Sequence, residues 1–281
     1  MHWMKSLYVS AYISASVTGL VGALVMTSRV GLASPWLGTA LACAGPVAFF
    51  ATVFTLPIAR TSPNLHAVLG AGVVGTLVSL VLAGGVLAAP TAIAGLVGIG
   101  GTVLYVYWYS RFARPTAPIL REGAVLPTFP LVEHGRDVAS ADLVGRPALW
   151  IFYRGNWCPL CVAQVREICA QYHELARRGV DVFLVSPQPE ANTAALADRC
   201  DAPLRFMTDR DNRAAAILGI LEKAGLPAGM QVFGYDSDVP RPTVFITGEG
   251  GRVLFCDHSE NYRVRPEPAQ YFAVLDWYAI A

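Results

Sequence analysis

The first 110 residues contain long apolar stretches with almost no charged positions. About 20 apolar residues suffice to cross the hydrocarbon core of a bilayer, and four uncharged stretches qualify, at about Leu7–Met26, Trp36–Ala59, Leu65–Leu87 and Thr91–Tyr109. The first stretch could be read as a signal peptide, but no convincing cleavage site bounds it and three more stretches follow, so we expect a retained helix. The pattern predicts an α-helical transmembrane bundle of about four helices.

After residue 128 the pattern changes to short apolar runs separated by turns. The uninterrupted runs at 148–153 and 180–185 favour strands buried on both faces, and 159–178 follows a helical pattern. Further expected elements are hairpins at 129–138 and 243–256, a strand at 204–207, and helices at 193–200, 213–218 and 268–280. Strands alternating with helices predict an α/β domain whose sheet is covered on both faces.

These patterns divide the chain into three parts. Residues 1–110 form the predicted transmembrane helical domain, 111–128 form a linker, and 129–281 form the α/β domain. The linker is expected from its prolines at positions 115, 118 and 127.

Charge is distributed unevenly between the two halves. No Asp or Glu precedes Glu122, whereas six of the 21 basic residues do, which leaves 15 basic against 20 acidic residues in the remainder, a net of −5. The part without acidic residues is typical of a membrane-embedded region, and the part of mixed charge is typical of a region in water. A net-acidic second half without a basic aromatic stripe argues against nucleic-acid binding.

The loop charges predict an orientation. Four crossings place both ends on one side, which then collects the basic residues 5, 60, 111, 114 and 121, while the other side has Arg29. Basic residues tend to stay in the cytoplasm. We therefore predict a multi-pass protein of the cell membrane, with the lipid bilayer as a partner and the α/β domain in the cytoplasm.

Small residues recur every four positions in the third apolar stretch, at Ala71, Gly75, Ser79 and Ala83. Such a stripe lets two helix backbones approach closely within a bundle. A transporter would more often carry a charged residue inside the membrane, and the span between Arg60 and Arg111 has none.

The motif Cys158-Pro159-Leu160-Cys161 lies at the junction of a predicted strand and a predicted helix. A helix N-terminus favours a thiolate, so Cys158 is expected to be the low-pKa nucleophile. Cys161 lies one turn later and is expected to attack the resulting mixed disulfide. We expect Trp157 to cover one side of the pair, and Arg154 to stabilise the thiolate.

A structural zinc site is the main alternative for this motif. Zinc would need two further ligands at regular spacing, and the other cysteines, Cys43, Cys169, Cys200 and Cys256, are scattered. We therefore predict no metal and no cofactor. Cys169 is expected in the core, Cys200 and Cys256 are expected to be inert, and Cys43 is interpreted as an apolar filler.

A second motif, Arg241-Pro242-Thr243, opens the apolar run 243–246. A proline directly before a strand suggests a turn, and the strand should run beside the one that leads to the cysteines. We therefore predict a cis bond before Pro242, with this proline beside the thiol pair.

The segment Phe152-Tyr-Arg-Gly-Asn-Trp-Cys-Pro-Leu-Cys161, together with Ser186-Pro187, Thr208-Asp209 and Arg241–Ile246, resembles the peroxiredoxin-like branch of the alkyl hydroperoxide reductase/thiol-specific antioxidant family. The resemblance covers about residues 123–281 and implies a thioredoxin-like fold. It also implies a cis-proline at Pro242 and places the active-site arginine of the family at Arg241.

The chain departs from the family at the peroxide-reactive cysteine. Typical members carry Pro-x-x-x-Thr-x-x-Cys; with that cysteine at Cys161, Arg154 replaces the proline and Cys158 replaces the threonine. The missing hydroxyl favours dithiol–disulfide exchange over peroxide reduction.

The predicted function is that of a membrane-anchored thiol–disulfide oxidoreductase, with a peroxide-reducing antioxidant activity left open. It requires a thiol electron donor and a disulfide or peroxide substrate. Two alternatives remain, a transmembrane carrier of reducing equivalents and a redox sensor. A carrier would need a second cysteine pair in the spans, where Cys43 is the single cysteine.

Overall fold

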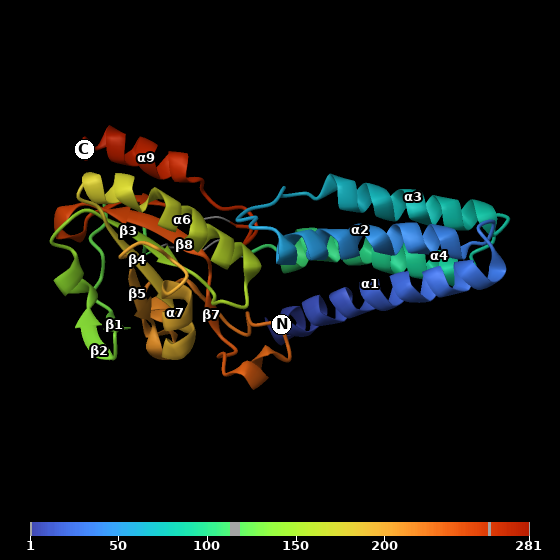
Figure 1. Ribbon diagram of the computed structural model, residues 1–281, viewed down its shortest axis with the longest axis horizontal. Helices are drawn as coiled ribbons and strands as arrows, with labels where there is room; N and C mark the ends of the chain where they lie inside the picture. Colours follow the sequence, from blue (N-terminus) through green and yellow to red (C-terminus); the bar gives the residue numbers. More distant parts are fainter. Residues whose placement is uncertain (1, 113–118, 258–259, 281) are drawn as a thin grey trace. The chain divides into compact units, whose positions relative to one another are not determined.

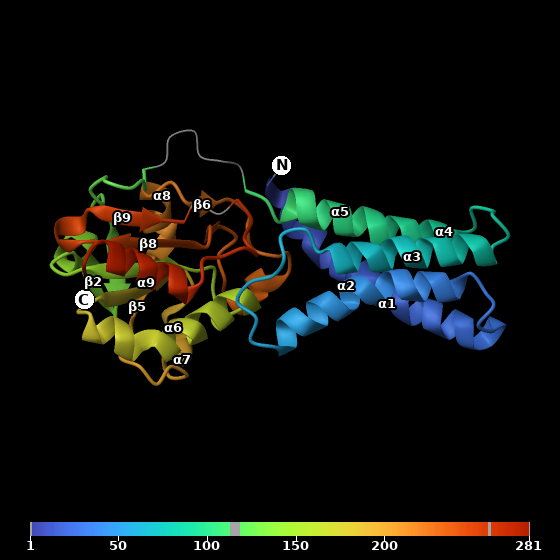
Figure 2. The same ribbon diagram turned by 90° about the horizontal axis from the view of Figure 1, so that it is seen from above.

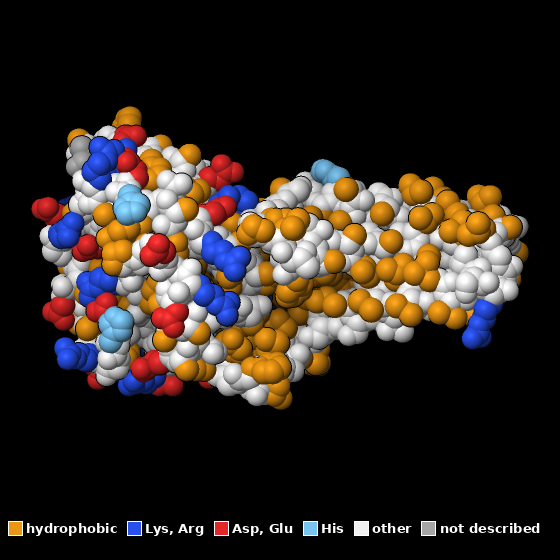
Figure 3. Space-filling model, viewed as in Figure 1, with side chains coloured by type: hydrophobic (Ala, Val, Ile, Leu, Met, Phe, Trp, Pro, Cys, Tyr) orange, Lys and Arg blue, Asp and Glu red, His pale blue; other side chains and the backbone are white. Residues whose placement is uncertain are grey.

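The computed structural model describes residues 2–112, 119–257 and 260–280 (Figure 1). The chain divides into two compact units, which are described separately. Trp3–Leu56 and Thr61–Arg111 form the first unit, whereas Pro57–Arg60 and the residues from Phe112 onward form the second. Residues 113–118 of the predicted linker lie outside the described residues. Figure 3 shows the charged side chains gathered over the second unit.

The first unit consists of helices. Their bounds are α1 (His2–Val30), α2 (Trp36–Thr55), α3 (His66–Leu82) and a fourth run made of α4 (Ala89–Ile93), the π-helix η1 (Ala94–Gly101), α5 (Thr102–Leu104) and the π-helix η2 (Tyr105–Tyr109). Within the described residues, three helical runs, 3–30, 36–55 and 89–109, are long and apolar enough to cross a membrane. The fourth apolar helix, α3, is shorter at 17 residues.

Two glycines allow α2 and α3 to pack backbone against backbone. A Cβ atom added to Gly38 would lie 2.2 Å from the backbone N of Ser79, and one added to Gly75 would lie 2.4 Å from the backbone N of Ala42. Gly75 and Ser79 belong to the small-residue stripe seen in the sequence. The stripe therefore serves helix packing within the bundle, as predicted.

The second unit is built on a seven-stranded mixed sheet, ordered β2-β1-β5-β4-β3-β8-β9. The strands are β1 (Pro130–Glu133), β2 (Arg136–Ala139), β3 (Ala148–Phe152), β4 (Asp181–Ser186), β5 (Arg205–Thr208), β8 (Thr243–Thr247) and β9 (Val253–Cys256). A separate pair joins β6 (Leu221–Glu222) to β7 (Val239–Pro240). The α-helices are α6 (Pro159–Arg177), α7 (Glu190–Ala197), α8 (Arg213–Ile217) and α9 (Pro268–Trp277). The 3₁₀ turns are η3 (Ser140–Leu143), η4 (Arg210–Asn212), η5 (Met230–Phe233) and η6 (Glu249–Gly251).

Strand β3 lies inside the sheet and is buried along its whole length. It runs parallel to β4 and antiparallel to β8. Trp150 and Phe152 point to the face that packs on α8, within one hydrophobic cluster. Figures 1 and 2 show α6 and α9 side by side on the other face. The sheet is therefore covered on both faces, as the uninterrupted apolar run predicted.

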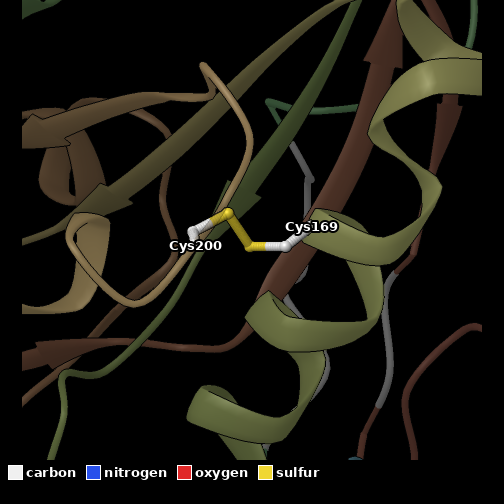
Figure 4. The surroundings of a disulfide bond; sticks show 2 residues. All are labelled: Cys169 and Cys200. Atoms are coloured by element: carbon white, nitrogen blue, oxygen red, sulfur yellow. A yellow bond between two sulfur atoms is a disulfide. The ribbon is translucent and has the colours of Figure 1, made fainter.

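A disulfide joins Cys169 on α6 to Cys200, which follows α7 (Figure 4). Helix α7 ends at Ala197, earlier than the sequence suggested, so Cys200 lies in the turn that approaches α6. The two Cα atoms are 5.8 Å apart. The assignment of Cys169 to the apolar core and of Cys200 as an inert thiol is therefore wrong, because the fold brings together two cysteines that are 31 residues apart in the sequence.

Candidate active site

The turn between β3 and α6 is held in place by a glycine and a buried glutamine. Gly155 has φ +137°, and a Cβ atom there would lie 3.0 Å from the Trp157 ring, so a glycine is required. Gln188, which follows β4, accepts a hydrogen bond from the Asn156 backbone N–H at 2.8 Å and donates to the Tyr153 hydroxyl at 3.1 Å. The turn that carries the cysteines is thus fixed to the neighbouring parallel strand.

The two cysteines of the motif lie at the start of α6, directly after this turn (Figure 1). Cys158 is the N-cap residue and Pro159 the first helical residue. The two Sγ atoms are 2.8 Å apart, within hydrogen-bonding distance. Cys161 is 0% exposed and Cys158 is 3% exposed, so a reaction partner must reach the pair through a narrow opening or after a local movement.

Arg265 is the described arginine that contacts both sulfurs. It lies between β9 and α9 and is buried. Its Nη2 donates to Cys161 Sγ at 3.3 Å and to Cys158 Sγ at 3.8 Å. A buried guanidinium beside a thiol favours the thiolate, because the opposite charge offsets the cost of burying the anion.

The surroundings of the pair favour an anion on Cys161 over one on Cys158. Burial raises the pKa of Cys161, but the hydrogen bond with Cys158 and the charge of Arg265 outweigh it and lower that pKa to about 5. Burial raises the pKa of Cys158 well above its usual value, and the bond to Cys161 and the Cys161 charge raise it further.

The order of the two thiol pKa values is therefore the reverse of the predicted order. The sequence argument gave the low pKa to Cys158 because of the helix N-terminus. In the structure both cysteines are buried, and the guanidinium of Arg265 lies closer to the Cys161 sulfur than to the Cys158 sulfur. The contact between the two sulfurs and the contact with Arg265 both favour the anion on Cys161.

Gln164 and Tyr271 fix the position of Arg265. Gln164 Oε1 accepts a hydrogen bond from Arg265 Nη1 at 2.7 Å, and its Nε2 donates to the Tyr271 hydroxyl at 3.3 Å. The Arg265 Nε donates to the Tyr262 carbonyl at 3.1 Å. All three nitrogens of the guanidinium therefore donate hydrogen bonds, and these hold it beside the two sulfurs.

Arg154 and Trp157, both predicted as site residues, contact each other. The guanidinium of Arg154 lies over the Trp157 ring at 5.3 Å and over the Tyr262 ring at 5.4 Å, and its Nη2 donates to the Gly225 carbonyl at 2.8 Å. Arg154 is 5% exposed, so it is not an ordinary surface arginine. Its charge lowers the pKa of Cys158 slightly, after the larger effects of burial and of Cys161.

The prediction of a cis bond before Pro242 is wrong. The strand that it opens, β8, does run beside β3, with Thr243 opposite Phe152. No peptide bond between described residues is cis, however, so the Arg241–Pro242 bond is trans. The chain passes extended from β7 into β8, with the Arg241 backbone N–H bonded to the Ile220 carbonyl, and needs no turn at this point.

The assignment of the family arginine to Arg241 is not supported. The Arg241 Nε donates to Glu222 at 3.2 Å, and its guanidinium lies 5.2 Å from the Phe112 ring. It directly follows β7, and the arginine that contacts the two sulfurs among the described residues is Arg265.

Sequence reasoning missed Arg265, Gln164 and Tyr271. One signal was available for Gln164, a polar residue three positions after Cys161 on the buried side of α6. Arg265 lies in a segment without helical or strand periodicity, so no pattern connected it to cysteines more than 100 positions earlier.

The comparison with protein families matches the region just described. Residues 123–255 fit the model of the AhpC/TSA family. The fit covers the strands of the sheet and the cysteine-bearing turn, and it ends ten residues before Arg265. The C-terminal domain is peroxiredoxin-like. The resemblance noted in the sequence is thus confirmed for this domain, and the thioredoxin-like α/β fold with it.

Individual relatives are distant. Peroxiredoxin Q, chloroplastic, of Gentiana triflora is 24% identical over 133 residues, which are 47% of this chain and 56% of that protein. The structure of peroxidoxin BcpB from Mycobacterium tuberculosis aligns over 58% of this chain and 99% of its own, with 17% identity and a TM-score of 0.47. The structure of reduced Prx3 from Vibrio vulnificus aligns over 56% of this chain and 99% of its own, with 17% identity and a TM-score of 0.49.

Proposed function

We propose that this protein is a membrane-anchored thiol peroxidase that cycles between the Cys158/Cys161 dithiol and its disulfide. The observation that carries the proposal is the contact of Arg265 with both sulfurs, which makes Cys161 a thiolate at neutral pH. A thiolate is the nucleophile in reactions with peroxides and disulfides alike.

In the first step the Cys161 thiolate attacks one oxygen of the peroxide. The O–O bond breaks, Cys161 becomes a sulfenic acid, and the other oxygen leaves as water or an alcohol after taking up a proton. In the second step the Cys158 sulfur attacks Cys161 Sγ, and water leaves. The result is a Cys158–Cys161 disulfide, which an external thiol donor reduces by two electrons.

Burial favours a peroxide over a protein disulfide as the substrate. Both sulfurs are at most 3% exposed, so a folded protein substrate cannot reach them without local opening, whereas a small peroxide needs far less room. This reverses the preference drawn from the sequence. Cys158, which stands where the family motif has threonine, supplies a thiol in place of the hydroxyl.

Anchoring in a membrane is supported by the three long apolar helical runs. The bilayer is therefore proposed as a partner, together with a peroxide substrate and a thiol donor.

Rapid mixing of the reduced full chain, in detergent, with hydrogen peroxide tests the function. We expect the Cys161→Ser variant to lose the reaction. The Cys158→Ser variant should react once and accumulate a sulfenic acid on Cys161, detectable by dimedone adduct mapping. Adducts on Cys158 in a Cys161→Ser variant, or exchange with small disulfides without any peroxide reaction, would overturn the assignment.

A further inference from the structure

The loop between α2 and α3 carries an arginine that belongs to the second unit. Arg60 lies in this loop, and residues 57–60 group with the peroxiredoxin-like domain. Its Nη1 and Nη2 donate to the two carboxylate oxygens of Glu167 at 3.1 and 2.5 Å, and Nη2 also donates to the Pro266 carbonyl at 3.3 Å.

Both partners of Arg60 lie next to parts of the thiol site. Glu167 is on α6, six residues after Cys161, and Pro266 directly follows Arg265. A bidentate arginine–carboxylate pair fixes direction as well as distance. Arg60 therefore ties the helix that bears the cysteines to the segment that bears Arg265.

A continuous set of hydrogen bonds leads from Arg60 to Cys161. The Pro266 carbonyl also accepts from the Tyr271 hydroxyl at 3.2 Å, and that hydroxyl accepts from Gln164. Gln164 in turn accepts from Arg265, which donates to Cys161. Gln164 and Tyr271 are each 2% exposed, so water does not readily replace these bonds.

We propose that Arg60 is a positioning residue for the thiolate, so that a loop between two predicted membrane helices completes the redox site. The proposal rests on the nucleophilic role of Cys161 in the proposed function. Loss of Arg60 frees the Arg265 segment from α6, weakens the contact of Arg265 with Cys161, and raises the pH at which the thiolate forms. The peroxiredoxin-like domain is then not an independent module, because its site uses a residue from the N-terminal region.

The test measures the rate of iodoacetamide reaction with the reduced full chain, in detergent, between pH 4 and pH 8. Each variant, the parent included, carries Ser in place of Cys43, Cys158, Cys169, Cys200 and Cys256, so Cys161 is the one thiol left to react. In Arg60→Gln we expect the midpoint of the profile to rise by about one pH unit, which is about a fivefold lower rate at pH 5. Glu167→Gln should shift the profile in the same direction, and Arg60→Lys should recover part of the shift.

Arg178→Gln is the matched control. Arg178 caps the C-terminal end of α6, far from the cysteines along the helix, and pairs with Glu174 of the same helix and with Asp276 of α9. Its profile should coincide with that of the parent, and thermal unfolding confirms that each variant is folded. Coincident profiles for Arg60→Gln, Glu167→Gln and the parent would overturn the proposal, as would an equal shift in Arg178→Gln. The iodoacetamide reaction does not depend on peroxidase turnover. If the parent protein does not react with hydrogen peroxide, the proposed function is refuted, but the iodoacetamide profiles still test the role of Arg60.

Discussion

At the scale of single residues, the chemistry depends on which sulfur carries the charge. A helix N-terminus favours an anion on Cys158, but a full positive charge at hydrogen-bonding distance acts more strongly than a partial dipole charge. Arg265 is nearer to Cys161 than to Cys158. The charge of Arg265 therefore outweighs the helix dipole in setting which thiol has the lower pKa.

Arg265→Met should make the Cys161 thiol nearly unreactive at neutral pH. The folded protein lowers the pKa of Cys161 to about 5; without the arginine charge we expect it to return to about 9. Thiolate then makes up about 1% at pH 7, which is about a 100-fold slower reaction with hydrogen peroxide. Stopped-flow rates from pH 5 to pH 9 check this, and unchanged rates at pH 7 would show that Arg265 does not control the thiolate.

At the scale of elements, helix α8 begins on a buried carboxylate. Asp209 accepts hydrogen bonds from the backbone N–H groups of Ala214 and Ala215 at 2.7 and 2.9 Å. Burial nevertheless raises the pKa of Asp209 to about 6, because these bonds offset only part of the desolvation cost. The first turn of α8 is thus held by a group that titrates in the mildly acidic range.

This arrangement predicts a pH-dependent stability. Since the pKa of Asp209 in the folded protein lies above its ordinary value of 3.8, the folded protein holds this proton more tightly than the unfolded chain. The associated stability is present below about pH 4 and is lost as the pH rises through about 6. We expect the free energy of unfolding to fall by up to about 3 kcal/mol over this pH range because of Asp209. In Asp209→Asn this part of the pH dependence should be lost, as measured by denaturant unfolding of the full chain at pH 4 to 7. The exposed Asp201→Asn variant should keep the parent dependence.

The strongly patterned elements of the second unit were predictable. The runs at 148–153 and 180–185 are β3 and β4, the segment from Pro159 is α6, and both hairpins form as expected. The pair β6–β7 was missed, because its strands have two residues each and show no alternation. Helix α7 starts three residues early, at Glu190, because Pro187 and Pro189 in the preceding turn obscured the boundary.

At the scale of the whole molecule, two observations bear on the side of the membrane and point in opposite directions. The loop charges predict a cytoplasmic domain, where stable disulfides are rare. The Cys169–Cys200 disulfide is typical of an oxidising compartment. A cytoplasmic domain is compatible with this disulfide only if the bond forms reversibly. Because the loop charges favour the cytoplasm, we predict a reversible bond.

Thiol labelling in intact cells separates the two cases. With the domain in the cytoplasm, a membrane-impermeant maleimide should leave Cys158 and Cys161 unlabelled, and rapid acid trapping should find Cys169 and Cys200 largely reduced. Labelling of the pair from outside, with Cys169 and Cys200 permanently oxidised, would place the domain outside the cytoplasm and contradict the charge argument. Lysed cells provide the control: because Cys158 and Cys161 are almost fully buried, the reagent must be shown to label this pair after lysis under the same conditions.

The sequence by itself determined the features that depend on local patterns. Apolar length set the helices of the first unit, uninterrupted apolar runs set the buried strands, and the Cys158–Cys161 spacing placed two thiols on one helical turn. Close packing at Gly75 was likewise visible as a four-residue repeat. Each of these features could be predicted from a pattern of residues that lie near one another in the chain.

Only the tertiary structure decided which residues complete the site. Arg265 and Arg60 reach the cysteine helix from segments about 100 positions away in either direction, and no periodicity encodes such a contact. The same holds for the Cys169–Cys200 bond and for the trans bond before Pro242, which depends on how β7 leads into β8. Charge placement in a buried site is a property of the folded chain, because it depends on which groups lose water together.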